Sequence, residues 1–97
     1  MFKDINPVAP IHYLIIPKIE DIKSISSLET DKYTFLLGEL LMTANKVSKL
    51  LKINDGFRLV INDGKNGGQT VNHIHLHFIG GQQLGWPPGV NNSKKLV

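Results

Sequence analysis

The chain has 97 residues, of which 41% are hydrophobic and 20% are charged. This length fits a single domain with its own core, spanning residues 1–97. The sequence contains no cysteine, which excludes disulfides and thiolate metal sites. No apolar stretch approaches the roughly 20 residues of a membrane span, and the start has no signal-peptide pattern, so we expect a cytoplasmic protein without a membrane partner.

The net charge of +3 is spread along the chain rather than gathered in one segment. Arg58 is the only arginine, while Lys46, Lys49 and Lys52 fall near the end of a predicted helix, where cations suit the helix dipole. A nucleic-acid surface would need clustered arginine and lysine with exposed aromatic residues. We therefore expect no nucleic-acid partner, although the positive charge is compatible with a small anion.

The segment 11–17 is rich in β-branched and aromatic residues and is bounded by prolines, which predicts a strand. His12 has the same parity as Leu14 and Ile16, so these three side chains share one face of that strand. From its neighbours alone, His12 could equally be a core histidine whose nitrogens bond internally.

Apolar residues recur every three or four positions between residues 30 and 51, which predicts an amphipathic helix. They are Tyr33, Leu36, Leu40, Ala44, Val47 and Leu51. The turn residues Asn54-Asp55-Gly56 predict its end. Ser26 and Glu29 have the spacing of a capping box, which predicts a shorter helical turn before this helix.

Residues 57–62 predict a second strand, and the turn-rich segment 63–68 connects it to a third strand over residues 73–78. We expect these two strands to pair antiparallel. The face expected beneath the helix comprises Leu59, Ile61, Ile74, Leu76 and Phe78. Asn62 would then lie on the opposite face, although as part of a turn it could be merely structural.

Three histidines alternate with apolar residues in the third strand. The segment reads His73-Ile74-His75-Leu76-His77-Phe78. Because successive strand side chains face opposite sides, the three imidazoles share the face away from the core. Imidazole has an unperturbed pKa near neutrality, so this row can supply a nucleophile, a proton donor or metal ligands.

Zinc is one use of such a row, because two or three histidines with an open water position form a hydrolytic zinc site. Direct attack on phosphorus is another, provided that the second ring nitrogen of the nucleophile donates to an acceptor. The preceding Gly67-Gly68-Gln69-Thr70 suits the second use, since glycine-rich backbone can turn its amides toward an anion and a threonine hydroxyl can donate to a leaving group.

Beyond Gly80-Gly81 the sequence loses its periodicity. The segment Trp86-Pro87-Pro88-Gly89 predicts an extended arm, because consecutive prolines exclude a helix. The expected fold class is therefore α+β, an antiparallel β-sheet with one long helix packed on it and an extended C-terminal arm.

At these residues the sequence resembles the histidine triad (HIT) family, whose motif alternates histidine with hydrophobic residues as residues 73–79 do. The resemblance covers nearly the whole chain. It extends through Asp4-Ile5-Asn6-Pro7, Ala9-Pro10-Ile11-His12, Ile15-Ile16-Pro17-Lys18, Val60-Ile61-Asn62-Asp63-Gly64, Gly67-Gly68-Gln69-Thr70 and Gly80-Gly81. The ending Trp86-Pro87-Pro88-Gly89 looks like the Hint branch of purine nucleoside phosphoramidases.

The resemblance implies hydrolysis of a nucleoside phosphoramidate without a metal or other cofactor. His75 would attack the α-phosphorus and form a nucleotidyl-histidine, which water then hydrolyses. His77 would bind phosphate oxygens, His73 would orient the nucleophile through its backbone carbonyl, and Thr70 would serve the leaving group. His12 matches a further histidine beside the triad.

The resemblance also implies a substrate pocket for a purine nucleotide such as AMP. Asn62, Gly68 and Gln69 match phosphate-contacting positions. Phe2, Asp4 and Ile5 match the nucleoside pocket, with Asp4 on the ribose hydroxyls. In this family two subunits pair with their sheets joined edge to edge, and the C-terminal arm with Trp86 reaches the partner's site, which implies a homodimer.

The family normally has a helix and a hairpin before the segment that matches Asp4, so the resemblance implies a single HIT domain over residues 1–97 that lacks them. One alternative is therefore a nucleotide-binding or interaction module with little or no catalysis. A further alternative from the histidine row itself is a zinc-dependent hydrolase.

Overall fold

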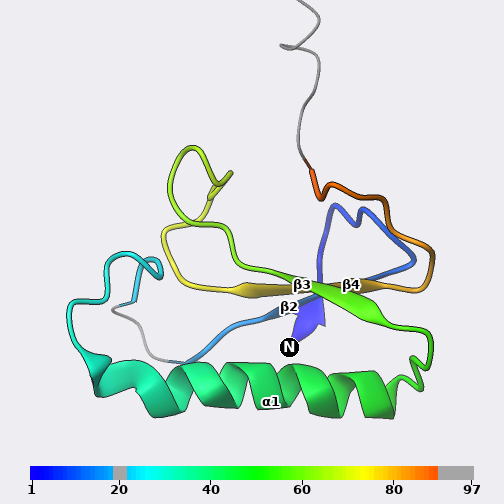
Figure 1. Cartoon of the computed structure of the whole chain (residues 1–97), viewed down its shortest axis with the longest axis horizontal. Helices are drawn as coiled ribbons and strands as arrows, with labels where there is room; N and C mark the ends of the chain where they lie inside the picture. The colour runs from blue at the N-terminus through cyan, green and yellow to red at the C-terminus, as the bar shows by residue number, and fades with distance from the viewer. Residues whose placement is uncertain (19–21, 90–97) are drawn as a thin grey trace, which may run out of the picture.

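The structure is a computed structural model that describes residues 1–18 and 22–89 (Figure 1). Its strands are β1 (Phe2–Lys3), β2 (Ile11–Ile15), β3 (Phe57–Val60) and β4 (Leu76–Gly80). Its long helix is α1 (Thr34–Leu50), preceded by the 3-10 turn η1 (Asp31–Tyr33). The sheet order is β1-β2-β4-β3, and every neighbouring pair is antiparallel. This arrangement confirms the predicted α+β class.

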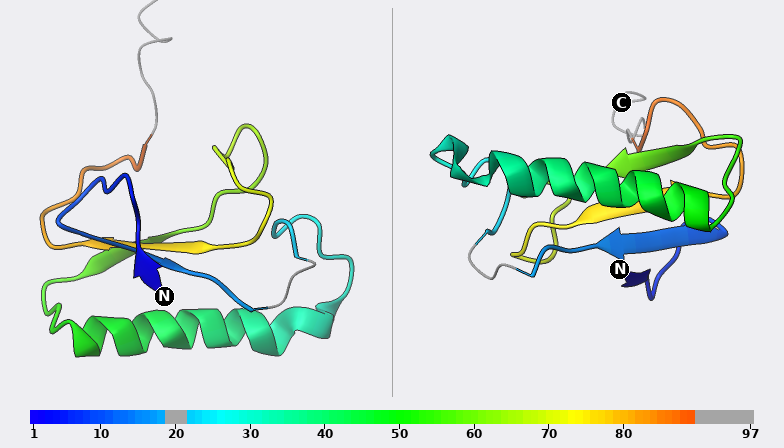
Figure 2. Two further views of the ribbon diagram at one scale, coloured as in Figure 1. Left: turned by 180° about the vertical axis from the view of Figure 1, so that it is seen from behind. Right: turned by 90° about the horizontal axis from the view of Figure 1, so that it is seen from below.

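Helix α1 covers one face of the sheet, and the loops that follow β1, β3 and β4 lie on the opposite side (Figures 1 and 2). The buried core between helix and sheet comprises Ile15, Leu40, Ala44, Val47, Leu76 and Phe78. Phe78 is completely buried, and its ring stacks on Phe57 with centroids 4.4 Å apart. The helix face predicted from the three-and-four spacing is thus the face that packs. No helix of the described residues is long and apolar enough to span a bilayer.

The ends of the helix differ from the prediction. Thr30 caps the short turn η1, its side chain accepting from the Lys32 amide, before α1 begins at Thr34. At the other end Lys52 adopts a left-handed conformation with φ of 56°, and the Ile53 amide donates to the Ser48 carbonyl. The helix therefore ends before Asn54-Asp55-Gly56, because the backbone reverses at Lys52.

Three predicted strands are shorter than expected. The strand predicted over 11–17 ends at Ile15, and the one predicted over 57–62 ends at Val60. The strand predicted over 73–78 begins only at Leu76. The start of β4 agrees with the register of its two neighbours. Leu76 pairs with Ile15, the final residue of β2, and His77 pairs with Val60, the final residue of β3. Residues before Leu76 therefore have no neighbouring strand to pair with.

A short helical turn precedes α1 as predicted, namely η1, but Thr30 caps it and Ser26 does not. The Ser26 amide and hydroxyl instead donate to the Asp63 carboxylate. One further prediction was wrong. Ile61 does not lie beneath the helix, because it follows the last residue of β3 and is 37% exposed. The arm is described as far as Gly89, and its segment 90–97 lies outside the described residues.

Candidate active site

The histidine row keeps its alternation although most of it precedes the strand. The three histidines are half-buried, whereas Ile74, Leu76 and Phe78 are buried in the protein. The predicted parity is thus present in the burial pattern. It places the imidazoles on the side of the row opposite the buried apolar side chains, where each is partly exposed and accessible to a ligand.

The tautomer of His75 is fixed by the backbone of the row itself. Its Nδ1 lies 2.8 Å from the His73 carbonyl oxygen. A carbonyl only accepts, so Nδ1 carries the proton and Nε2 of neutral His75 keeps a free lone pair. The carbonyl can turn toward the ring because His73 lies outside the sheet ladder. His75 therefore presents a nucleophilic nitrogen.

His12 and His77 form a directed hydrogen-bonded pair. The Val8 amide donates to His12 Nδ1 at 3.1 Å, so neutral His12 carries its proton on Nε2. That Nε2 lies 2.8 Å from His77 Nδ1, which must accept. Neutral His77 consequently carries its proton on Nε2, where it can donate to an anionic oxygen. One backbone amide thus sets the tautomers of two imidazoles.

Asp4 adds a carboxylate to this pair. Its Oδ2 lies 3.4 Å from His12 Nε2 and 3.9 Å from His77 Nδ1. Its Oδ1 accepts from the Asn6 amide at 2.8 Å, and its own amide donates to the His12 carbonyl. The shorter distance between the two imidazoles shows that His12 donates chiefly to His77, with Asp4 as a nearby charge.

The pKa of His77 lies below its ordinary value of 6.5. Burial is the largest cause, since it disfavours the imidazolium, and the neighbouring His75 and His12 lower the pKa further. The Asp4 carboxylate opposes them by raising it. His77 is therefore neutral at physiological pH, which is the state that the hydrogen bond from His12 requires.

His73 contacts the segment that follows β2. Its Nε2 donates to the Pro17 carbonyl at 3.1 Å. The Ile74 amide next to it donates to the Ile22 carbonyl at 2.9 Å. The start of the row is thus held by backbone acceptors on both sides of segment 19–21, instead of by strand pairing.

Asp4, His12 and His77 could each offer one ligand atom to a metal, and these atoms lie within 4.8 Å of one another. Binding a metal through His12 Nε2 would move the proton of the neutral ring to Nδ1, where the Val8 amide already donates. A metal would therefore cost that hydrogen bond, so these residues do not fit one in the present arrangement. Within the described ranges, the three histidines of the row form no such group of ligands.

The glycine loop between β3 and the row holds the predicted phosphate-contacting residues. Asn62 Nδ2 donates to the Gly67 carbonyl at 2.7 Å, as expected for a residue that closes a turn. The Gly68 amide donates to the Lys65 carbonyl, and the Gln69 amide donates to the Gly64 carbonyl. Thr70 is exposed. Binding an anion through these two amides would require their present bonds to open.

The predicted nucleoside residues lie at the start of the chain and in the arm. Phe2 and Ile5 are 52% and 91% exposed, whereas Asp4 lies against the histidine pair instead of projecting alone. Trp86 is 82% exposed. Arg58 donates to the Gly85 carbonyl at 2.7 Å, and its guanidinium lies 6.0 Å from the Trp86 ring centroid, so Arg58 of β3 contacts the start of the arm.

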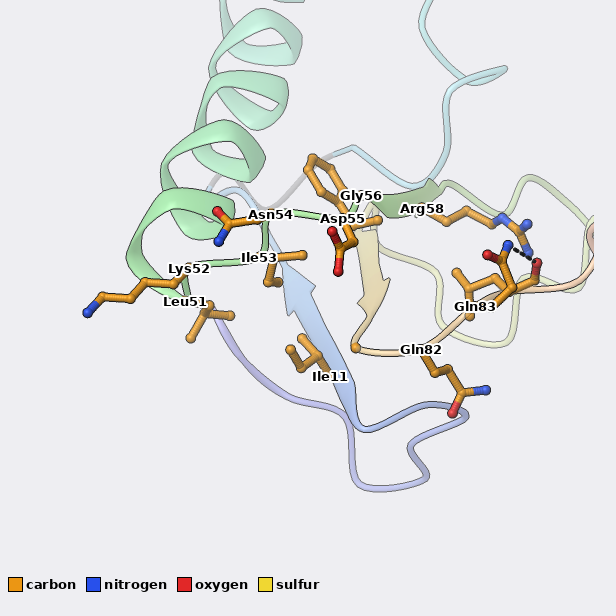
Figure 3. Close-up of a pocket in the computed structure, with 13 residues that line it drawn as sticks. Ile11, Leu51, Lys52, Ile53, Asn54, Asp55, Gly56, Arg58, Gln82 and Gln83 are labelled. Carbon is orange, nitrogen blue, oxygen red and sulfur yellow. Dashed lines mark hydrogen bonds between the residues drawn. The ribbon is translucent and has the colours of Figure 1, made fainter.

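A cavity of about 710 Å³ lies at the other end of the sheet (Figure 3). Segments 51–58 and 81–84 line it together with Ile11. It contains none of the four histidines. A smaller hollow of about 300 Å³ is lined by Asp4 and His12 among others. The histidine chemistry thus lies on an open face of the sheet, away from the larger cavity.

Sequence reasoning missed several groups that organise this site. The Val8 amide and the Pro17 carbonyl are backbone groups, which residue types do not reveal. The contact of Ser26 with Asp63 was hidden because both residues also fit common local turn patterns. The hydrogen bond from the Asn6 amide to Asp4 could have been anticipated from Asp4-Ile5-Asn6, since an aspartate commonly accepts from the amide two residues further on.

Comparison with known proteins identifies the family. Residues 1–84 match the HIT domain. The chain is 49% identical to the 14 kDa zinc-binding protein of Zea mays over 88 residues, which is 91% of this chain and 69% of that protein. It is also 49% identical to the adenylylsulfatase HINT1 of Arabidopsis thaliana over 88 residues, covering 91% of this chain and 60% of that one.

Among solved structures, a HIT family hydrolase from Legionella pneumophila Philadelphia 1 superposes with a TM-score of 0.85 at 46% identity. The match covers 91% of this chain and 78% of that one. A histidine triad protein from Clostridium difficile gives a TM-score of 0.80 at 35% identity, covering 93% and 75% of the two chains. In motif, topology and overall sequence, this chain belongs to the HIT domain family, with Hint-like relatives.

Proposed function

We propose that this protein hydrolyses the bond between a nucleoside monophosphate and its leaving group, acting on AMP-type phosphoramidates. The observation that carries the proposal is the hydrogen bond from His75 Nδ1 to the His73 carbonyl, because it leaves Nε2 as a free nucleophile. The chain belongs to the HIT domain family, and its relatives include proteins named as a hydrolase and as an adenylylsulfatase. These names support hydrolysis of a nucleotide.

In the first step His75 Nε2 bonds to the phosphorus as the bond from phosphorus to the leaving nitrogen breaks. The amine departs after taking up a proton from solvent, and the nucleotide remains on the imidazole. In the second step water attacks the phosphorus and releases a proton to solvent, the bond to Nε2 breaks, and the nucleoside monophosphate leaves with the histidine restored. Nδ1 keeps its proton throughout and donates it in a hydrogen bond to the His73 carbonyl, which holds the ring in place.

His77 supports this reaction as a neutral donor. Its Nε2 proton points away from the His12 bond, and its lowered pKa keeps the ring uncharged, so it donates one hydrogen bond to a phosphate oxygen. Thr70 would donate to the leaving nitrogen, and its exposure leaves the hydroxyl accessible. His12 acts through His77 by fixing its tautomer.

The remaining substrate contacts follow the family pattern. Asn62 and the backbone of the loop that carries Gly68 and Gln69 would hold the phosphate, while Phe2 and Ile5 would contact the purine base. Asp4 would bind the ribose while its other oxygen stays on the Asn6 amide. We also propose a cytoplasmic homodimer of single-domain chains, in which Trp86 lies near the partner's site.

The test is release of amine and AMP from an adenosine phosphoramidate, with adenylyl sulfate assayed in parallel to compare leaving groups. His75→Ala should lower turnover at least about a thousandfold, because it removes the atom that forms the covalent bond. Asn72→Ala, an exposed neighbour, is the control and should retain activity. Mass spectrometry after rapid quenching should detect nucleotide on His75.

Equal turnover by wild-type and His75→Ala proteins would contradict the proposed mechanism. AMP binding without turnover of either substrate would favour the nucleotide-binding module. Metal analysis of dialysed protein addresses the zinc alternative, for which we expect well below one zinc per chain.

A further inference from the structure

The glycine loop is tied to a segment that is distant in sequence. Segment 22–26 precedes helix α1, and it lies beside the loop of residues 62–70 (Figures 1 and 2). Ser26 and Lys23 bond to the loop, and the Ile22 carbonyl accepts from the Ile74 amide. Because Ile74 adjoins His75, this one segment contacts both the loop and the histidine row.

Asp63 forms one half of this connection. Its Oδ2 accepts from the Ser26 amide at 2.9 Å, and its Oδ1 accepts from the Ser26 hydroxyl at 2.8 Å. Both oxygens of the carboxylate are thus directed at one residue. Hydrogen bonds to an ionised acceptor are stronger than those between neutral groups.

Gln69 forms the other half. Its Nε2 donates to the Lys23 carbonyl at 2.6 Å and to the Val71 carbonyl at 3.0 Å, while its Oε1 accepts from the Gly64 amide at 2.9 Å. Both amide hydrogens are therefore in use. The side chain bridges the two ends of the loop and fastens them to segment 22–26.

The loop between these two residues folds tightly on itself. Gly64 and Gly68 have φ of 69° and 77°, and a Cβ atom at Gly67 would collide with the Asp63 backbone. Inside the loop, Asn62 donates to the Gly67 carbonyl, and the Gly68 and Gln69 amides donate to loop carbonyls. The side chains of Asp63 and Gln69 instead reach outside the loop and bond it to segment 22–26.

We infer that Asp63, Ser26 and Gln69 are positioning residues that clamp the glycine loop to segment 22–26, the segment that also holds the start of the histidine row through Ile74. The clamp itself is independent of any substrate, whereas its consequence for phosphate binding rests on the proposed function. In this arrangement Gln69 acts on phosphate through the loop, since both hydrogens of its amide are already donated to carbonyls.

Amide hydrogen exchange without ligand tests the clamp. The Gly68 amide is the reporter, because neither Asp63→Ala nor Gln69→Ala removes its own acceptor, the Lys65 carbonyl. Each substitution should speed its exchange roughly tenfold, about the effect of losing a hydrogen bond to a charged group or several neutral ones. Asp55→Ala and Gln82→Ala, exposed residues of the distant cavity, are the matched controls.

Ser26 supplies a milder variant and a rescue. Ser26→Ala keeps the backbone bond to Asp63 and should speed exchange less than Asp63→Ala, whereas Ser26→Thr retains the hydroxyl and should behave as wild type. The double variant Asp63→Ala/Ser26→Ala should exchange no faster than Asp63→Ala alone, because the Ser26 hydroxyl acts through Asp63.

Two measurements test the positioning role of Asp63 and Gln69. They are the affinity for AMP, measured by calorimetry, and the steady-state kinetics. Asp63→Ala and Gln69→Ala should both weaken AMP binding and raise KM more than they lower kcat, unlike His75→Ala, because they displace the phosphate contacts and spare the nucleophile.

Unchanged Gly68 exchange in both variants would overturn the clamp whatever the substrate proves to be. Weaker AMP binding in Gln69→Ala alone would make Gln69 a direct ligand and overturn its positioning role. Failure of the proposed function would instead appear in the wild-type protein, as absence of AMP binding, and the exchange experiment would still decide the clamp.

Discussion

At the scale of single residues, the site is organised by the hydrogen bonds of its imidazole nitrogens. His75 Nδ1 bonds to a carbonyl, and His12 Nδ1 accepts from the Val8 amide. These partners decide which nitrogen of each ring carries a proton. Imidazole itself has no strong preference for carrying its proton on Nδ1 or on Nε2. Backbone groups therefore make His75 a nucleophile and His77 a neutral donor.

The lowered pKa of His77 predicts how stability depends on pH. The unfolded chain takes up a proton at His77 near pH 6.5, before the folded protein does, so the free energy of unfolding should fall as pH drops from 6.5 through the lower, folded pKa. Urea unfolding at pH 7.5, 6.5 and 5.5 measures this dependence. In His77→Gln the dependence should be weaker; an unchanged dependence would contradict the prediction.

At the scale of elements, the helix and the row were predictable because both follow simple periodicities. The spacing of Leu40, Ala44 and Val47 fixed the buried helix face, and the alternation from Ile74 to Phe78 fixed the buried side of the row. The strand ends were not predictable in this way. They depend on where β2 and β3 stop, which is a property of the neighbouring strands.

Phe78 and Phe35 offer a matched test of the core. Phe78 is fully buried between sheet and helix, whereas Phe35 on α1 is 79% exposed. Phe78→Ala should lower the free energy of unfolding by about 3–5 kcal/mol through lost burial and a cavity. Phe35→Ala should change it by less than about 0.5 kcal/mol.

Denaturant unfolding monitored by circular dichroism compares the two substitutions. If Phe78→Ala does not fold, Phe78→Leu gives a milder cavity at the same position. Similar losses for Phe78 and Phe35 variants would contradict the assigned core.

At the scale of the whole molecule, the sheet has an open edge at each side within the described residues, because β1 and β3 each have one neighbour. Unpaired strand edges readily pair with another chain. The edge at β3 is the longer one, with four residues against two in β1. Its Phe57 is 38% exposed, and Ile61 directly after it is 37% exposed. We therefore take β3 as the edge joined in the proposed homodimer.

We therefore predict a particle of twice the 10.8 kDa chain mass in sedimentation equilibrium. Ile61→Lys, which places a charge at the end of β3, should shift the population toward monomer at the same concentration. Leu50→Lys, at a 74% exposed position at the end of α1, is the control for added charge. A monomer for the unaltered chain would refute the proposed assembly.

The amino-acid sequence by itself determined the helix, the alternating histidine row, the glycine loop and the resemblance to the HIT family. It did so because these features are local and reside in residue type and spacing. The tertiary structure decided which nitrogen of His75 is free, the pairing of His12 with His77 beside Asp4, and the contact of Ser26 with Asp63. These depend on backbone carbonyls, amides and side chains from distant segments, whose meeting only the folded chain specifies.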